Sequence, residues 1–327
     1  MRVIIYGAGA IGGVVGGYLA YSGQQVVLIG RPGHVKLINE QGLRLVTPMG
    51  TRVLRLPAFT SPEQVDFQPD DVVFLTVKGQ NTEEALQNLQ AVIKEIPIFC
   101  VQNGVRNEET ASRYFAKVYG VMVRAGAIYL KEGEVTARND PPGGLVIGRY
   151  PKGTDNLVNL VAANLRNAGF FVKVTPDIMP YKWGKLMSRG SLTNTITGIC
   201  NAERKEIALL TGAAEKEAQE LLAEANISWV SEEALEKEWP ELTMPVRSRL
   251  NIEAYGSTWQ SLARGAGTTE TEFFNGEVVR LAKRLGRQAP INEKLLVICQ
   301  QMAVNREPPG KYTPAQLSKL LGLSQSS

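Results

Sequence analysis

The sequence has few of the residues that usually bind metals, form disulfide bonds or transfer protons. Its 327 residues include one histidine, His34, and three widely spaced cysteines, Cys100, Cys200 and Cys299. No C-x-x-C pair occurs, and one histidine cannot complete a zinc-ligand set, so we expect no metal site. Because sparse, odd-numbered cysteines are typical of a reducing compartment, we expect buried thiols and a cytoplasmic protein.

Long runs of one charge are also missing. The chain carries 36 basic and 32 acidic residues, a net charge of +4, with no basic stripe. Nucleic-acid-binding surfaces usually concentrate basic residues on one face, so we expect small molecules and no nucleic acid as partners. Hydrophobic residues make up 44% of the chain, which is typical of a globular protein with a sizeable core, and the length is sufficient for two domains.

The stretch from Ile4 to Tyr21 has no charged side chain and is largely apolar, as in a signal peptide or a membrane span. Six glycines between Gly7 and Gly17 interrupt any stable apolar helix there. We therefore expect no membrane partner and attribute the glycines to a binding loop.

Short β-rich runs alternate with helical stretches over the first half of the chain. The β-rich runs include residues 2–6, 25–30, 70–79, 96–104 and 170–176. This alternation predicts an α/β domain, a Rossmann-type parallel sheet covered by helices, over residues 1–178. Beyond Thr175-Pro176 strand patterns nearly vanish, and residues 206–227 and 269–286 place apolar side chains on one helical face. We therefore predict an all-α domain over residues 179–327.

Residues Gly7-Ala8-Gly9-Ala10-Ile11-Gly12 form a G-x-G-x-x-G motif. The motif alone is a weak signal, but here it follows a predicted strand and begins a predicted helix, as in dinucleotide-binding proteins. The first glycine allows the tight turn, the second admits the pyrophosphate, and the third lets the helix pack on the strand. The N–H groups at the helix start bind the phosphates, so we predict a dinucleotide site here.

The residues after the second predicted strand indicate which dinucleotide is bound. NAD sites usually carry an acid there for the ribose hydroxyls, whereas this chain reads LIGRPGH, with Arg31 in that place. A guanidinium can hold a 2′-phosphate with two hydrogen bonds, so we predict NADP(H) as the cofactor. The alternative is that Arg31 is a solvated loop charge.

Two polar residues end neighbouring predicted strands. Lys78 ends the strand in FLTVKG, and Asn103 ends the strand in CVQNG. Ligands of open parallel sheets lie outside the carboxyl ends of the strands, so we expect both side chains to face the cofactor and the substrate. A single lysine or asparagine at such a position is often only a turn residue, but two equivalent positions favour a binding role.

Together these motifs resemble the ketopantoate reductase (2-dehydropantoate 2-reductase) family. The matching segments, in order along almost the whole chain, are GAGAIGG, GRPGH, TVKGQNTEEAL, QNGV, the KL of Lys185, STWQSL and TETEFFNG. The resemblance implies a Rossmann domain, a helical C-terminal domain, a cleft between them, and NADPH-dependent reduction of a 2-oxo acid. It implies 2-dehydropantoate as the leading substrate and a homodimer formed through the helical domain.

Carried onto this sequence, the resemblance makes Lys185 the general acid and places Glu270 beside the cofactor and that lysine. Hydride delivery to a ketone carbon leaves an alkoxide that needs a proton, and a lysine can supply it when desolvation and nearby cations lower its pKa. The same cation stabilises the developing oxyanion. The alternatives are that Lys185 only extends from an apolar helix face and that Glu270 only caps a helix.

The resemblance also assigns substrate contacts. Lys78 and Asn103 would face the substrate as well as the cofactor. Ser257 would bind the substrate carboxylate, with Thr258 as the alternative because the match slips by one residue there.

The chain departs from the family pattern after Lys185, where the family usually has K-L-x-x-N-x-x-x-N-P. Arg189 occupies the first asparagine position, and either Thr193 or, after a one-residue insertion, Asn194 occupies the second. On a continuous ideal helix Arg189 shares the face of Lys185, whereas Asn194 points to the opposite side. We favour a π-bulge that returns Asn194 to the pocket.

Arg189 bears on the choice of substrate. In the cleft it would lower the pKa of Lys185 and bind a second anionic group, which favours a 2-oxo or 3-oxo acid other than 2-dehydropantoate. Alternatively, Arg189 pairs with Glu270 or Glu253 and only stabilises the domain. A third hypothesis is a non-catalytic NADPH-binding regulator, although such a protein would need neither Lys185 nor Glu270.

Overall fold

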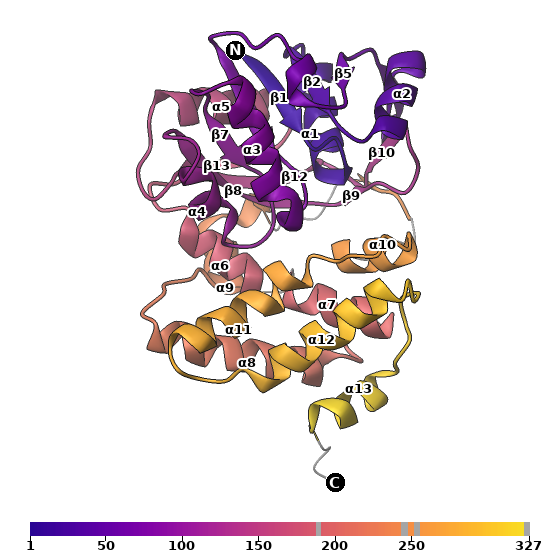
Figure 1. The fold of residues 1–327 in the computed structure, drawn as a ribbon, viewed down its shortest axis with the longest axis vertical. Helices are drawn as coiled ribbons and strands as arrows, with labels where there is room; N and C mark the ends of the chain where they lie inside the picture. The colour runs from indigo at the N-terminus through magenta and orange to yellow at the C-terminus, as the bar shows by residue number, and fades with distance from the viewer. Residues whose placement is uncertain (188–190, 243–247, 252–255, 324–327) are drawn as a thin grey trace. The chain divides into compact units, whose positions relative to one another are not determined.

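The computed structural model describes residues 1–187, 191–242, 248–251 and 256–323 (Figure 1). The chain forms two compact units, the first made of Met1–Tyr181 with Glu233–Ile252 and the second of Lys182–Glu232 with Glu253–Ser327. The sequence pattern did not indicate that the segment 233–252 returns to the first unit.

An eight-stranded sheet forms the centre of the first unit, with the strand order β13-β12-β8-β7-β6-β1-β2-β5. Its strands are β1 (Arg2–Tyr6), β2 (Val26–Ile29), β5 (Ala58–Phe59), β6 (Asp71–Leu75), β7 (Ile98–Cys100), β8 (Val118–Ala125), β12 (Gly143–Arg149) and β13 (Phe171–Val174). Neighbouring strands are parallel except for β8 and β12, which are antiparallel. The predicted α/β fold with a parallel sheet is confirmed.

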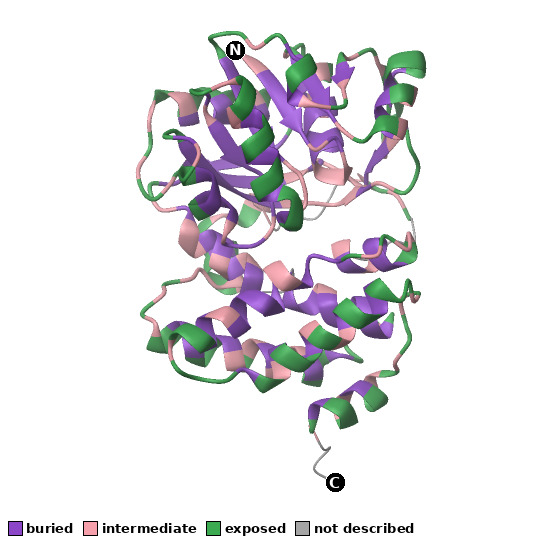
Figure 2. Cartoon of the chain, in the orientation of Figure 1, coloured by how far each residue is buried: buried purple, intermediate pink, exposed green. Residues whose placement is uncertain are grey.

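Helices cover both faces of this sheet. They are α1 (Ala10–Tyr21), α2 (Pro32–Gln41), α3 (Thr82–Val92), α4 (Asn107–Ser112) and α5 (Asn156–Asn167), with 3-10 turns η1 (Pro62–Gln64) and η2 (Gly79–Asn81). Val3 and Ile5 of β1 pack in one core with residues of α1 and α5, whereas Ile4 and Tyr6 pack in another with residues of α3. Burial on both faces explains why the central strands read as continuous apolar runs (Figure 2).

A second sheet packs against α1, with the strand order β4-β3-β10-β9. Its strands are β3 (Leu43–Thr47), β4 (Gly50–Leu54), β9 (Ala127–Ile128) and β10 (Glu134–Ala137), and a separate pair is formed by β11 (Asn139–Asp140) and β14 (Ser248–Arg249). A methyl group on Gly13 would lie 2.6 Å from Val135 Cγ1, and one on Gly17 would lie 3.2 Å from Leu45 Cδ2. The later glycines of α1 therefore allow this sheet to approach the helix closely.

Beyond residue 178 the described chain is mainly helical, which confirms the predicted helical C-terminal region. The elements are α6 (Met179–Met187), α7 (Leu192–Cys200), α8 (Ala208–Glu224), α9 (Glu232–Glu238), η3 (Pro240–Leu242), α10 (Ser257–Ala263), η4 (Thr271–Phe273), α11 (Asn275–Arg284), α12 (Pro290–Val304) and α13 (Pro314–Leu321). Ile196, Leu210 and Leu295 join α7, α8 and α12 in one core. None of the described helices combines the length and apolar composition that a bilayer crossing requires.

The helical pattern predicted over 269–286 is interrupted. Phe274 has φ −119° and ψ −90° and is fully buried, so the 3-10 turn η4 and the helix α11 are separate elements. The last helix begins and ends as its sequence indicates, because Thr313 and Gln316 form a capping box and Gly322 has φ +76°.

A buried lysine fixes the returning segment to the first unit. Lys173 of β13 is 6% exposed, and its Nζ forms an ion pair with Glu238 at the end of α9. The same ammonium lies 4.5 Å from the ring centroid of Trp239 and 5.3 Å from that of Tyr181. Tyr181 also donates a 3.1 Å hydrogen bond to Glu238 Oε2. Together the carboxylate and the two rings offset the desolvation of the Lys173 ammonium. The hydrogen bond from this ammonium in turn holds the pKa of Glu238 below its ordinary value.

Replacement of Lys173 by methionine should lower the free energy of unfolding by about 1 kcal/mol, because the cation–π contacts and the ion pair with the half-exposed Glu238 are lost together. Urea unfolding of Lys173→Met measures this change. The matched control is Lys152→Met, since Lys152 pairs with Asp177 at the surface, where its side chain is 76% exposed. A loss no larger than that of the control would contradict the role given to Lys173.

Candidate active site

The loop between β1 and α1 makes a tight turn that its first and third glycines require. Gly7 has φ +117°, and a Cβ there would lie 2.5 Å from Val77 N. A Cβ on Gly12 would lie 2.3 Å from the Gly7 carbonyl oxygen and 2.5 Å from Thr76 Oγ1. Thr76 Oγ1 itself donates a 2.9 Å hydrogen bond to the Gly7 carbonyl. Any side chain at Gly7 or Gly12 would displace the turn.

The middle glycine of the motif faces open space. No described atom lies within 4 Å of a Cβ built on Gly9, which is the N-cap of α1. The loop is held in place by the N–H groups of Gly7 and Ala8, which donate to the Ile29 carbonyl at 2.9 and 3.0 Å. The N–H groups of Ala10 and Ile11 begin the helix, where such groups have no intrahelical partner. These residues therefore fit a dinucleotide pyrophosphate.

Lys78 and Asn103 lie at equivalent places in the first unit. Leu75 and Cys100 are paired at the ends of the parallel strands β6 and β7, and Lys78 and Asn103 each follow three residues later. Both side chains are half-buried. The sheet therefore brings the two predicted site residues to the same edge, outside the carboxyl ends of its strands.

A buried polar network, to which the sequence analysis assigned no role, connects these two loops. Gln102 Nε2 donates to the Val77 carbonyl at 2.9 Å and to Thr82 Oγ1 at 2.8 Å. Thr82 Oγ1 donates to Asn107 Oδ1 at 3.0 Å, and Asn107 Nδ2 donates to the Asn103 carbonyl at 2.9 Å. The QNGV segment contains Gln102, but the sequence does not indicate that this side chain points inward, because its partners lie on the loop that follows the neighbouring strand β6.

Arg31 is the N-cap of α2, with Pro32 as the first helical residue. Its side chain is exposed, and no ion pair of Arg31 is found in the described part of the chain. The guanidinium is therefore available to an anion at the end of β2.

His34 of α2 packs against the segment between β9 and β10. It is 2% exposed, its Nδ1 accepts a 2.8 Å hydrogen bond from Gly133 N, and its ring contacts that of Tyr129 at a centroid distance of 4.8 Å. Desolvation lowers the pKa of His34 below its ordinary value of 6.5, and the nearby Ala8 carbonyl opposes this only in part. The one histidine is thus a neutral packing residue, which agrees with the choice of Lys185 as the candidate acid.

Lys185 and Glu270 belong to the second unit. Lys185 is half-buried on α6, and Glu270 is 8% exposed. Glu270 is the N-cap of η4, but no side-chain hydrogen bond caps this turn. The capping hydrogen bond of the alternative is therefore not found at η4, and the roles of Lys185 and Glu270 stay predictions.

The candidate substrate residues of the second unit gather where α7 packs on α10. A Cβ on Gly256 would lie 2.0 Å from Asn194 Oδ1, so the Asn194 carboxamide lies against the backbone that precedes Ser257. A Cβ on Gly198 would lie 2.8 Å from Thr258 Cγ2. The hydroxyl oxygens of Thr193, Ser257 and Thr258 are buried and have no hydrogen-bond partner among the described residues. Such hydroxyls are candidates for binding a polar ligand.

The proposed π-bulge falls between Lys185 and Asn194, where residues 188–190 lie outside the described part of the chain, so it stays a prediction. On either side of these residues the structure describes α6 through Met187 and α7 from Leu192, with Ser191 as the N-cap of α7. Arg189 lies outside the described residues.

Comparison with known proteins identifies the family. The model of the ketopantoate reductase PanE/ApbA family matches residues 3–152, and that of its C-terminal domain matches residues 177–303. The chain belongs to the ketopantoate reductase PanE/ApbA family. The 2-dehydropantoate 2-reductase of Pyrococcus horikoshii is 31% identical over 299 residues, which cover 89% of this chain and 94% of that protein. The resemblance inferred from the motifs is confirmed, and the family consists of oxidoreductases.

A solved structure of this family and one of a D-mandelate dehydrogenase share the fold. The PanE/ApbA family ketopantoate reductase from Ralstonia eutropha JMP134 is 27% identical, with a TM-score of 0.77 over 94% of this chain and 99% of that one. A D-mandelate dehydrogenase, in complex with NADH and anilino(oxo)acetate, is 22% identical, with a TM-score of 0.78 over 94% and 99% of the two chains. The similarity to D-mandelate dehydrogenase shows a shared fold and nothing about the substrate or cofactor of this protein.

His34 should titrate with a midpoint below 6.5 in the folded protein. The unfolded chain binds a proton at the ordinary pKa, so the free energy of unfolding decreases as the pH falls from 6.5 towards the lower folded pKa. Because the chain has one histidine, a single imidazole NMR signal reports the titration directly. Denaturant unfolding of His34→Gln should show a weaker pH dependence in this window, and a midpoint at or above 6.5 would contradict the burial argument.

Proposed function

We propose that this protein reduces a 2-oxo acid to a 2-hydroxy acid with NADPH, and that 2-dehydropantoate, giving pantoate, is its leading substrate. The observation that carries the proposal is the open face of Gly9 at the start of α1, in a chain matched by both family models. The domain over residues 1–178 binds the cofactor in this scheme. The domain over residues 179–327 supplies the proton and holds the substrate.

The residues of the glycine loop hold the pyrophosphate of the cofactor, and the residues that follow β6 and β7 hold its nicotinamide half. Gly7, Gly9 and Gly12 shape the cradle, and the N–H groups at the start of α1 bind the phosphates. Lys78 and Asn103 face the cofactor and the substrate. When bound, the cofactor supplies the hydride to the carbonyl carbon of the substrate.

Lys185 is the proposed catalytic acid. Its Nζ donates a proton to the substrate oxygen as negative charge develops there, and its positive charge stabilises that oxyanion. The buried Glu270 carboxylate orients Lys185 and contacts the cofactor. Ser257 binds the substrate carboxylate, with Thr258 as the alternative, because the hydroxyls of both residues are buried without a partner among the described residues. Thr193 and Asn194, on α7, line the same pocket.

NADPH oxidation with 2-dehydropantoate and a panel of other 2-oxo and 3-oxo acids tests this assignment. Lys185→Ala should lower kcat about 100- to 10,000-fold, the usual contribution of a general acid. Lys216→Ala, which removes an exposed lysine from α8, is the matched control and should keep full activity. Equal turnover by Lys185→Ala and the control would disprove the role of Lys185.

Arg31 should make the protein prefer NADPH to NADH. Arg31→Ala should weaken NADPH binding about 10- to 100-fold and leave NADH binding almost unchanged, because charged hydrogen bonds to the 2′-phosphate are lost. Quenching of tryptophan fluorescence by each cofactor measures both affinities without turnover. Equal affinities in the unmodified protein that Arg31→Ala does not alter would contradict the NADP assignment.

Arg189 supports a second candidate within the same class. In place of an asparagine it favours an oxo acid with a second anionic group, which the substrate panel would reveal. Binding of NADPH without oxidation of any acid would instead favour a regulator. We also propose a homodimer, since Val297 and Val304 of α12 are 53% and 73% exposed on the second unit. We propose a cytoplasmic location because the sparse cysteines are typical of a reducing compartment.

A further inference from the structure

A carboxylate from a distant part of the chain lies against the start of α2. A Cβ built on Gly33 would lie 2.3 Å from Glu132 Oε2 and 2.4 Å from Glu132 Oε1. The Glu132 carboxylate therefore fills the space that a side chain at position 33 would take. Gly33 is two residues after Arg31, the N-cap of the same helix.

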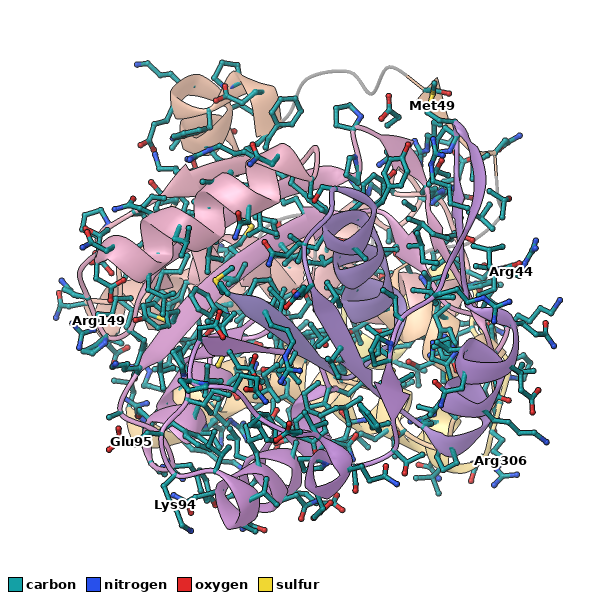
Figure 3. All side chains as sticks on the ribbon, turned by 90° about the horizontal axis from the view of Figure 1, so that it is seen from above. Arg44, Met49, Lys94, Glu95, Arg149 and Arg306 are labelled. Carbon is teal, nitrogen blue, oxygen red and sulfur yellow. The ribbon has the colours of Figure 1, made fainter. Side chains whose placement is uncertain are left out.

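The loop that carries Glu132 is held to both α2 and β3 through Gly133. Gly133 N donates a 2.8 Å hydrogen bond to His34 Nδ1 of α2, and a Cβ on Gly133 would lie 3.1 Å from Leu37 Cβ. The Gly133 carbonyl accepts a 2.9 Å hydrogen bond from Arg44 N of β3, whose side chain points outward in Figure 3. The position of Glu132 beside α2 is thus set by the next residue, Gly133, which is hydrogen-bonded to α2 through its N–H and to β3 through its carbonyl.

This carboxylate stands at the ribose end of the candidate dinucleotide site. Gly7 N and Ala8 N both donate to the carbonyl of Ile29, the last residue of β2, and a Cβ on Gly30 would lie 3.2 Å from Ala8 Cβ. In this fold the residues just after β2 contact the 2′ position of the adenosine ribose. The chain after β2 offers Arg31 but no acid, whereas the β9–β10 loop brings one to the same place.

We propose that Glu132 is a second determinant of cofactor choice and acts against Arg31. A carboxylate beside the 2′ position repels a 2′-phosphate and accepts a hydrogen bond from a 2′-hydroxyl. The preference for NADPH that Arg31 confers is therefore reduced, and NADH remains a usable cofactor. This inference rests on the proposed dinucleotide site.

An acid at the start of a helix also stabilises the helix dipole, and this purely structural role makes a different prediction. If Glu132 served only α2, its removal would lower thermal stability and leave ligand selectivity unchanged. A role in cofactor choice changes the selectivity for the 2′-phosphate, with or without a change in stability.

The experiment compares 2′,5′-ADP with 5′-AMP, which differ only in the 2′-phosphate, by isothermal titration calorimetry on the full-length protein. We expect Glu132→Gln to raise the ratio of the two affinities about five- to tenfold, mainly through tighter binding of 2′,5′-ADP. The increase in the affinity ratio should be smaller at high salt, because salt screens the repulsion between solvent-exposed charges. Glu40→Gln is the matched control: it removes one exposed carboxylate from the other end of α2 and should leave the ratio unchanged.

The outcomes separate this inference from the proposed function. An increased ratio in Glu132→Gln but not in Glu40→Gln supports the role of Glu132. Binding of both nucleotides with the same ratio in all three proteins overturns that role and leaves the dinucleotide site intact. If neither nucleotide binds the unmodified protein, the dinucleotide site is wrong and the inference about Glu132 falls with it.

Discussion

The close contact among β1, the glycine loop and α1 is the constraint on which the rest of the first unit depends. The Gly12 backbone lies so near the Gly7 carbonyl and Thr76 Oγ1 that no side chain fits between them. This contact directs the start of α1 to the open side of Gly9. The same helix then accepts the second sheet through Gly13 and Gly17. One run of glycines thus sets the binding loop and the packing of two sheets.

Polar groups around this loop are ordered by contacts between segments far apart in the chain. Gln102 joins the loops that carry Lys78 and Asn103, and His34 joins α2 to the β9–β10 loop. Both are buried, so each hydrogen bond lies where water cannot replace it, and its loss would leave an unsatisfied group. A rigid sheet edge with such tethers can hold polar residues on its loops in fixed positions.

Much of the fold was predictable because its signals are local. The apolar runs predicted the central strands, and the residues at both ends of α13 are ones that typically cap a helix. The interruption at Phe274 was not predictable, since the apolar pattern continues through it and only its burial explains the change of backbone direction.

The sequence by itself determined the dinucleotide motif, the arginine after β2, the lysine and asparagine at two strand ends, and the family. These features depend on residue type and short spacing, which the chain carries directly. The tertiary structure decided that Asn194 lies against Gly256 and that Glu132 lies against Gly33. Those pairs are separated by tens of residues, and their contact arises only when strands and helices pack, because shape and burial, rather than spacing, bring such groups together.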